Sequence, residues 1–345
     1  MYRIFINSIV EKCAIKFANA VLNAKPYKTE LLHFKDHLTC SDKTFENAAK
    51  DYVQLLLDVY KKNGAATRSA SLSDSILSNI SSSFLSYIAK FEKIIPQNKL
   101  MTSIEYKNSN GTICNGAFWQ VLVKVMDYER FKSIYYQCME DIGISTCVYC
   151  NMAPANNCDD NIANYQMEHF YPKNQFPFLS TSFFNFFPSC GTCNQKKGKK
   201  FDKDGFDLYR EKMSDCPNPF KFPTKDAYCY YKQIGDDREK FGKETNVVVF
   251  FSSPFKYAEK QIQKLKIEER YNCSRVRKKI FDLLKKYEYN THTRIKVTQK
   301  TFPLIPLQAD EIYGVFGECS KEEDIHKEQL TKFAIDFGKE TGMLP

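Results

Sequence analysis

The sequence predicts a mostly α-helical protein that carries one small α+β insert. Three observations lead to this prediction. Apolar residues recur at helical spacing in the first 145 residues and again in residues 255–289. Between these regions lie two Cys-x-x-Cys pairs, and the 39 residues that separate them can hold a small folded unit. Three prolines in residues 215–223 then form a connector that cannot be helical.

These observations divide the chain of 345 residues into three regions. We expect residues 1–145 to form a helical N-terminal domain that can bind a partner. Residues 146–205 are expected to form a compact module held together by a metal ion. Residues 206–345 are expected to form a basic, mainly helical C-terminal region.

Apolar spacing also places individual elements. In the N-terminal region it predicts helices over residues 48–60 and 117–139 and along a stripe of large apolar residues, which is interpreted as facing the core. The stripe consists of Leu72, Ile76, Leu77, Ile80, Phe84, Leu85, Ile88 and Phe91. Residues 103–111 are interpreted as a loop because Asn, Ser and Gly favour turns. The C-terminal region is expected to hold a buried strand over 246–251 and two basic helices over 255–289.

The two Cys-x-x-Cys pairs indicate a closed metal site. Each pair can present two sulfurs to one ion, and four thiolates complete the tetrahedral shell typical of structural Zn²⁺. The expected ligands are Cys147, Cys150, Cys190 and Cys193, with Cys158 as a spare candidate. The alternative is that buried, unpaired cysteines fall at this spacing by accident.

Cysteine usage also bears on location. The chain has 13 cysteines, an odd number, and its N-terminus shows no sustained apolar segment typical of a secretory signal. No apolar run approaches the length of a membrane span. Reduced thiols in the cytoplasm are therefore the expectation.

The segment between the pairs contains residue types that can catalyse the hydrolysis of phosphodiesters. Cleavage of such an anion needs a deprotonated water and a cation on the developing charge. His169 can take a proton as a neutral imidazole, and Glu168 precedes it. Since side chains alternate along a strand, this pair needs a strand end or a bulge to face one site. Asn185 and Asn194 are further candidates for this site. Each residue also has a simpler interpretation: Glu168 as a solvated or His-orienting carboxylate, Asn185 as a turn or edge residue, and Asn194 as a helix cap.

The order Cys-x-x-Cys, Glu-His, Asn, Cys-x-x-Cys-Asn, Lys-Gly over residues 147–200 resembles the zinc-bound branch of the HNH endonuclease family. The resemblance implies a ββα-metal module in which His169 is the general base. It also implies that Glu168 and Asn194 hold one Mg²⁺ or Mn²⁺, and that Asn185 orients the loop after His169. Glu168 stands where the family usually has Asp, so the carboxylate is kept on a longer arm.

Positive charge is concentrated at and after this segment. Residues 191–300 contain 27 Lys and Arg against 15 Asp and Glu, a net charge of +12, whereas the whole chain carries +9. A polyanion such as DNA is expected to dock there. Candidate phosphate contacts are Lys173, Lys196, Lys197, Lys199 and Lys200, and further basic residues are Arg270, Arg275, Arg277, Lys278 and Lys279. A solvated charged face is the alternative for each.

The stretch Leu265-Lys-Ile-Glu-Glu-Arg-Tyr-Asn272, with the basic helix after it, is similar to bacterial HNH proteins of anti-phage defence. These proteins include the nuclease subunits of Septu-type or retron-associated systems, which partner with an ATPase. This chain has no Gly-x-x-x-x-Gly-Lys-Ser/Thr loop of its own, so the resemblance implies a separate ATPase subunit.

Three functions are compatible with these residues. The first is a metal-dependent DNA endonuclease. The second is a non-catalytic zinc-ribbon module that binds nucleic acid or a protein partner. The third is an RNase or a nickase, because the same site serves RNA and one ββα module cuts one strand at a time.

Overall fold

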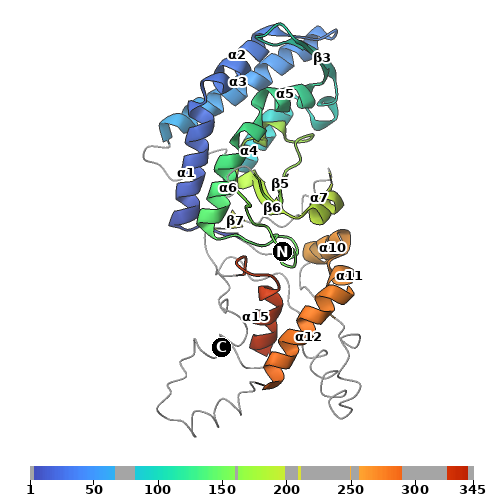
Figure 1. Ribbon diagram of the computed structural model, residues 1–345. Helices are drawn as coiled ribbons and strands as arrows, with labels where there is room; N and C mark the ends of the chain where they lie inside the picture. The colour runs from blue at the N-terminus through green and yellow to red at the C-terminus, as the bar shows by residue number, and fades with distance from the viewer. Residues whose placement is uncertain are drawn as a thin grey trace.

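The computed structural model describes residues 4–66, 82–159, 162–198, 209–210, 249, 256–289 and 325–340. These residues are mostly helical with three small sheets, which confirms the predicted combination of a helical fold and a small β part (Figure 1). One cluster of buried side chains runs from Ile4 to Ala334. The division into three domains stays a prediction. None of the helices in the described part of the chain is long and apolar enough to cross a membrane.

Four helices open the chain: α1 (Ser8–Asn23), α2 (Lys25–His37), α3 (Lys43–Ala66) and α4 (Ser82–Ile94). The Asn7 side chain caps α1 by accepting hydrogen bonds from the backbone N–H groups of Ile9 and Val10. Helix α3 contains the helix predicted over 48–60. The end of the predicted stripe lies in α4, where Phe91 is buried, while its residues 72–80 lie outside the described residues.

The loop predicted over residues 103–111 is confirmed for 108–111 and wrong for 103–107. Residues Ser103–Lys107 form strand β3, which pairs antiparallel with β4 (Ile113–Ala117) and with the short β2 (Leu38–Thr39). The alternating burial of Ile104 and Tyr106 favours a strand. The turn residues occupy only the tip, where the Asn108 side chain accepts hydrogen bonds from two backbone N–H groups.

The single helix predicted over 117–139 is broken in two. Helix α5 (Phe118–Met126) ends at Asp127, whose φ of 41° lies in the left-handed region. A 3₁₀ turn, η3 (Tyr128–Phe131), follows, and α6 (Lys132–Ile142) completes the region. Aspartate tolerates this conformation better than most residues, which permits the break without glycine or proline.

The central part is a two-stranded hairpin followed by a short helix. Strand β5 (Gln166–His169) pairs antiparallel with β6 (Phe186–Ser189), and α7 (Gly191–Lys197) follows directly. Two 3₁₀ turns, η4 (Pro177–Leu179) and η5 (Phe183–Asn185), lie in the connection between the strands. The register places Phe186 opposite His169, so aromatic packing against the helical region fixes the strand end.

The C-terminal part contributes α10 (Lys256–Leu265), α11 (Ile267–Tyr271), α12 (Ser274–Tyr289) and α15 (Thr331–Glu340). Residues 256–289 therefore form three helices instead of the two predicted, because Lys266 adopts a left-handed φ of 50°. Helix α10 packs against α7, as Figure 1 shows. Strand β7 (Tyr209–Arg210) pairs in parallel with β1 (Ile4–Phe5). Only Val249 of the predicted strand 246–251 is described, and the proline connector lies outside the described residues.

Candidate metal centre and active site

The four predicted cysteine ligands lie together. The sulfurs of Cys147, Cys150, Cys190 and Cys193 are all within 4.8 Å of one another, and all four residues are buried. A tetrahedral zinc with Zn–S bonds of about 2.3 Å requires sulfurs separated by about 3.8 Å, so the cluster fits that ion after a small contraction. It is the only such group of metal-ligating side chains in the described residues. Cys158 is exposed and takes no part in it.

The sequence explains how the sulfurs meet. Cys147 and Cys150 precede β5, and the backbone N–H of Asn151 turns back to the carbonyl of Cys147. Cys190 caps α7, and Cys193 lies in the first turn of that helix. The cluster therefore clamps the segment before β5 to the end of β6 and the start of α7. Metal binding at such a site contributes directly to folding.

A guanidinium from a distant helix contacts the cluster. Arg270 of α11 donates from Nη1 to Cys193 Sγ at 2.9 Å, and its Nη2 lies 3.5 Å from Cys190 Sγ and 3.7 Å from Cys150 Sγ. Although burial opposes its charge, the sulfurs of Cys193 and Cys150 raise the pKa of Arg270 above its usual value. Arg270 is thus engaged with the cysteine cluster, and its contact with a phosphate backbone stays a prediction.

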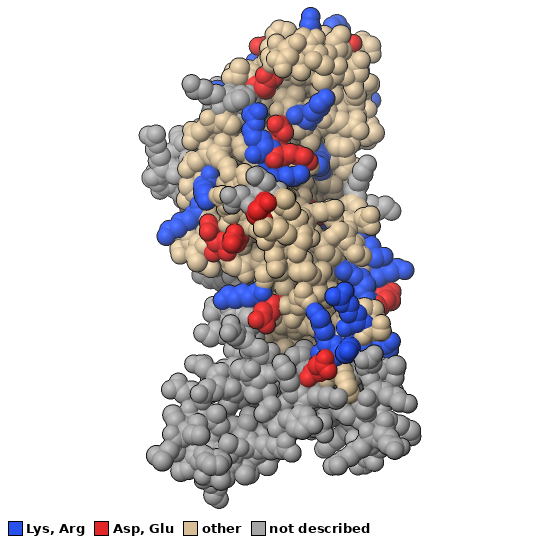
Figure 2. Space-filling view, in the orientation of Figure 1, with Lys and Arg blue, Asp and Glu red and all other residues tan. Residues whose placement is uncertain are grey.

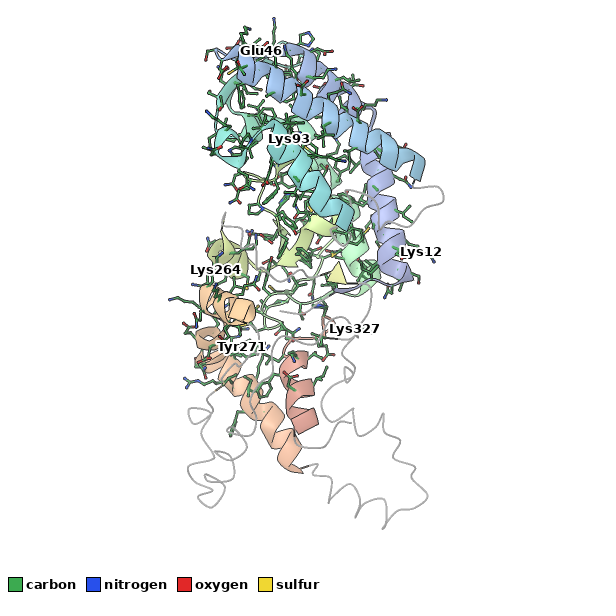
Figure 3. All side chains as sticks on the ribbon, turned by 180° about the vertical axis from the view of Figure 1, so that it is seen from behind. Lys12, Glu46, Lys93, Lys264, Tyr271 and Lys327 are labelled. Carbon is green, nitrogen blue, oxygen red and sulfur yellow. The ribbon has the colours of Figure 1, made fainter. Side chains whose placement is uncertain are left out.

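The two residues after Arg270 also make side-chain hydrogen bonds to the backbone of other segments. The Tyr271 hydroxyl, labelled in Figure 3, donates to the carbonyl oxygen of Cys150 at 2.7 Å. The Asn272 side chain exchanges two hydrogen bonds with the backbone of Val249. The sequence offered no signal for these contacts, because they join residues that are 121 and 23 positions apart in the chain.

Next to the cluster lies an open cleft of about 340 Å³. Three parts of the chain line it: α5 and η3 of the N-terminal region, β5 with the residues after it, and α7. The lining residues that bear on chemistry are Trp119, Tyr128, Glu168, His169, Lys173 and Asn194. The structure therefore brings three of the four predicted catalytic residues to one cleft, with the fourth, Asn185, behind it.

The surroundings of His169 orient its ring and favour the neutral imidazole. Its ring packs edge-on against Tyr128 and Phe186, with centroid separations of 4.9 and 4.8 Å. Its Nε2 lies 3.1 Å from the carbonyl oxygen of Ser180, and a carbonyl can only accept, so Nε2 carries the proton. Burial, aided by the nearby Lys173 charge, lowers the pKa of His169 to about 3. Nδ1 is therefore the ring nitrogen that can accept a proton.

Glu168 is 4% exposed, and both of its carboxylate oxygens have partners. The Tyr149 hydroxyl donates to Oε2 at 2.7 Å, and the Lys197 ammonium lies 2.5 Å from Oε1. Burial raises the pKa of Glu168, and Lys197 opposes that rise. Glu168 and His169 are the last two residues of β5, where the strand end lets both reach the cleft, as the alternation argument required.

Asn185 lies fully buried in the loop between the strands. Its Oδ1 accepts from the Tyr171 backbone N–H at 2.7 Å, and its Nδ2 donates to the carbonyls of Tyr171 and Leu179 at 3.2 and 3.0 Å. Ser180, whose carbonyl orients His169, follows Leu179 directly. Asn185 therefore holds the segment that holds the imidazole.

The remaining predicted residues have different surroundings. Asn194 Nδ2 donates to Gln166 Oε1 beside the cleft. Lys173 donates to the Tyr128 hydroxyl at 2.9 Å and lies 4.2 Å from the centroid of that ring, while burial lowers its pKa. Lys197 is engaged with Glu168 and with the His169 carbonyl rather than presented to solvent. Lys196 is half-buried on α7, and Lys199 and Lys200 lie outside the described residues.

Sequence reasoning missed several contributors to this site. Tyr149 stands inside the first Cys-x-x-Cys pair, so its place beside the metal cluster was predictable, and its hydroxyl bonds Glu168. Tyr128 and Trp119 come from the N-terminal region, and nothing local indicates that they reach the cleft. Ser180 acts through its backbone carbonyl, which any residue supplies.

Exposed basic side chains gather beside these sites. Figure 2 shows Lys and Arg concentrated in the lower right of the view, in the area of the C-terminal helices. The exposed basic residues of α10–α12 and their connections include Lys260, Lys266, Arg275, Lys278 and Lys279. These helices also carry Arg270, and α10 packs on α7, which lines the cleft.

Comparisons with known proteins give one short match. No family model matches the chain, and no solved structure matches it. A Septu protein, PtuB of Bacillus thuringiensis, is 40% identical over 52 residues, which cover 15% of this chain and 19% of that protein. The match thus spans about a fifth of the relative's length. It supports a relation to Septu proteins through one segment only.

Proposed function

We propose that this protein is a metal-dependent endonuclease of the HNH type that hydrolyses DNA phosphodiester bonds. The observation that carries the proposal is the state of His169. A neutral imidazole with a fixed tautomer stands in an open cleft beside a buried carboxylate, and the elements around it follow the order strand, strand, helix. A base within reach of a water is what phosphodiester hydrolysis requires of the protein.

The residues would divide the work as follows. His169 Nδ1 takes the proton of the attacking water, while the Ser180 carbonyl keeps the ring in the required tautomer. The pKa of about 3 makes the imidazole a weak base in the free protein, and an anionic phosphate in the cleft would raise it toward the working range. Asn185 keeps the loop, and so the carbonyl, in position.

A divalent cation would be held by Glu168 and Asn194. Both line the cleft, and carboxylate and amide oxygens are donors that Mg²⁺ and Mn²⁺ prefer. When bound, such an ion stabilises the charge that develops on the phosphate and leaving oxygens. Because the Lys197 ammonium already lies on Glu168 Oε1, the cation has to take the place of that ammonium. Metal binding would then release Lys197 toward the substrate.

The wider role is proposed from the resemblance of the chain and from its short match. The similarity to Septu-type proteins favours a function in bacterial anti-phage defence with a separate ATPase subunit. The exposed basic side chains of α10–α12 favour docking of a nucleic-acid backbone beside the cleft.

The test is plasmid nicking by the zinc-loaded protein with Mg²⁺ or Mn²⁺. His169→Ala should nick at least about 100-fold more slowly, as expected for loss of a general base. His33→Ala is the matched control, because His33 lies on α2, where it stacks on His37 outside the cleft. Equal nicking by wild type and His169→Ala would contradict the assigned base.

The alternative is a non-catalytic zinc module. It is supported if the protein binds DNA but cleaves no form of it with any divalent metal, even when a copurifying partner is present. Cleavage of RNA in place of DNA would keep the site and change the substrate.

A further inference from the structure

We propose that Trp119 forms a subsite for an unpaired nucleobase next to the scissile phosphate, so that the cleft takes single-stranded or locally opened nucleic acid. This inference rests on the proposed function and specifies its substrate. Trp119 lines the same cleft as His169 and Glu168, although it comes from the N-terminal region, about 50 residues earlier in the chain.

The backbone fixes where the indole lies. Trp119 is the second residue of α5, and its N–H donates to the carbonyl of Leu100 at 3.3 Å, while the N–H of Phe118 donates to that of Thr102 at 2.9 Å. These bonds tie the start of the helix to the segment that leads into β3. The side chain is therefore carried by a rigid corner of the fold, which suits a binding platform.

The ring itself is held at its polar edge. Its Nε1 lies 3.2 Å from the sulfur of Met101, a residue that is 64% exposed. The indole N–H is thus satisfied outside the cleft, and the ring is half-buried at the cleft wall. Trp119 thus adds an aromatic side chain to a cleft that Glu168 and His169 also line.

The residues that line the cleft suit the two parts of a nucleotide, the base and the phosphate. Every base has a π-face that stacks on an aromatic ring, and such stacking is independent of sequence. The His169 imidazole and the Lys173 ammonium line the same cleft, and the ammonium suits a phosphate. A base that is paired in a duplex presents only its edge and must be flipped out at a cost of a few kcal/mol before it can stack.

Trp119 is the only tryptophan of the chain, so its fluorescence reports this subsite directly. The probe is a mixed-sequence single-stranded DNA oligonucleotide, titrated into full-length, zinc-loaded His169→Ala protein to prevent cleavage. We expect saturable quenching, with the same strand annealed to its complement binding about tenfold or more weakly. Absence of quenching, or equal quenching by heparin, would overturn the proposal.

Two variants separate stacking from structure. Because both variants lack the only tryptophan, their binding is measured by the anisotropy of a labelled single strand. Trp119→Ala should weaken binding about tenfold, whereas Trp119→Phe, which keeps an aromatic face and most of the packing, should recover a large part of it. Ile113→Ala is the control, since Ile113 is an exposed apolar residue of β4 that does not line the cleft. Loss of affinity in Trp119→Ala that matches the loss in Trp119→Phe, at unchanged melting temperature, contradicts stacking.

The outcomes distinguish the subsite from the nuclease activity. Quenching by single strands without cleavage by the wild type keeps the subsite and removes the proposed reaction. If the wild type cleaves DNA, and Trp119→Ala cleaves single and double strands at the same rates as the wild type does, the reaction stands and the subsite is refuted.

Discussion

The cysteine cluster and the cleft are built on one short hairpin, yet they differ in almost every physical respect. The cluster is buried, its four sulfurs face one another, and Arg270 compensates their charge. The cleft is open, and its groups carry shifted pKa values and face a space of about 340 Å³. The interactions of a closed site stabilise the fold, whereas the groups of an open site stay accessible to a substrate. Changes in the two should therefore separate stability from chemistry.

The largest expected effect is on the closed site. Cys190→Ser should lose the metal and destabilise the protein by on the order of 5 kcal/mol or more, because zinc binding energy at such sites is folding energy. Thermal unfolding followed by circular dichroism measures it. Cys158→Ser is the matched control, since Cys158 is exposed and outside the cluster. A Cys190→Ser protein that melts like the control would remove the difference between the two sites.

The next effect concerns Asn185, whose loss should lower both stability and activity. Asn185→Ala removes three hydrogen bonds of a fully buried amide and leaves two backbone carbonyls and one N–H without that partner. We expect a loss of about 2–3 kcal/mol in the free energy of unfolding and a lower nicking rate, because the Ser180 carbonyl loses its support. Urea denaturation measures the first quantity, with exposed Asn115→Ala as the control. Full stability together with full activity would show that Asn185 positions nothing.

A smaller effect is expected at Arg270. Arg270→Met should cost about 1–2 kcal/mol and speed the loss of zinc to a chelator, since the thiolates lose donors and compensating charge. The rate of zinc release measured with a coloured chelator tests this, with exposed Arg275→Met as the control. If both variants release zinc at the rate of the wild type, the guanidinium has no part in the metal site.

The smallest effect lies far from both sites. Glu46 accepts hydrogen bonds from Lys43, Lys50 and the backbone N–H of Cys40, which lower its pKa to about 2. A carboxyl with a lowered pKa in the folded state contributes stability above about pH 4.5 and loses it as the pH falls toward 2. Glu46→Gln should therefore be less stable at pH 6 and show a weaker dependence of its urea midpoint on pH between 5 and 2. An unchanged slope would exclude this contribution.

The sequence predicted the parts of the molecule whose information is local. Each Cys-x-x-Cys pair is a local pattern, although 39 residues separate the two pairs, and apolar spacing within a few helical turns predicted α3. The hairpin β3–β4 was missed because the polar turn around Asn108 outweighed the alternation of Ile104 and Tyr106. The break at Asp127 had no glycine or proline to announce it.

The candidate site was predictable in its residue types and unpredictable in its partners. Glu168, His169 and Asn194 meet at one cleft as expected. Their neighbours Trp119 and Arg270 arrive from distant segments through tertiary packing, which no local pattern records. The pairing of Lys197 with Glu168 likewise depends on how α7 leaves the cluster, so a residue predicted to touch phosphate lies on a carboxylate instead.

The most direct test of the account is the zinc content of the purified chain after exhaustive dialysis against a mild chelator, measured by elemental analysis. We predict one zinc per chain for the wild type and for His169→Ala, because the buried sulfurs hold the ion whatever happens in the cleft. A wild-type chain that is fully folded and free of zinc would contradict the account, since nothing would then clamp the hairpin that carries the imidazole.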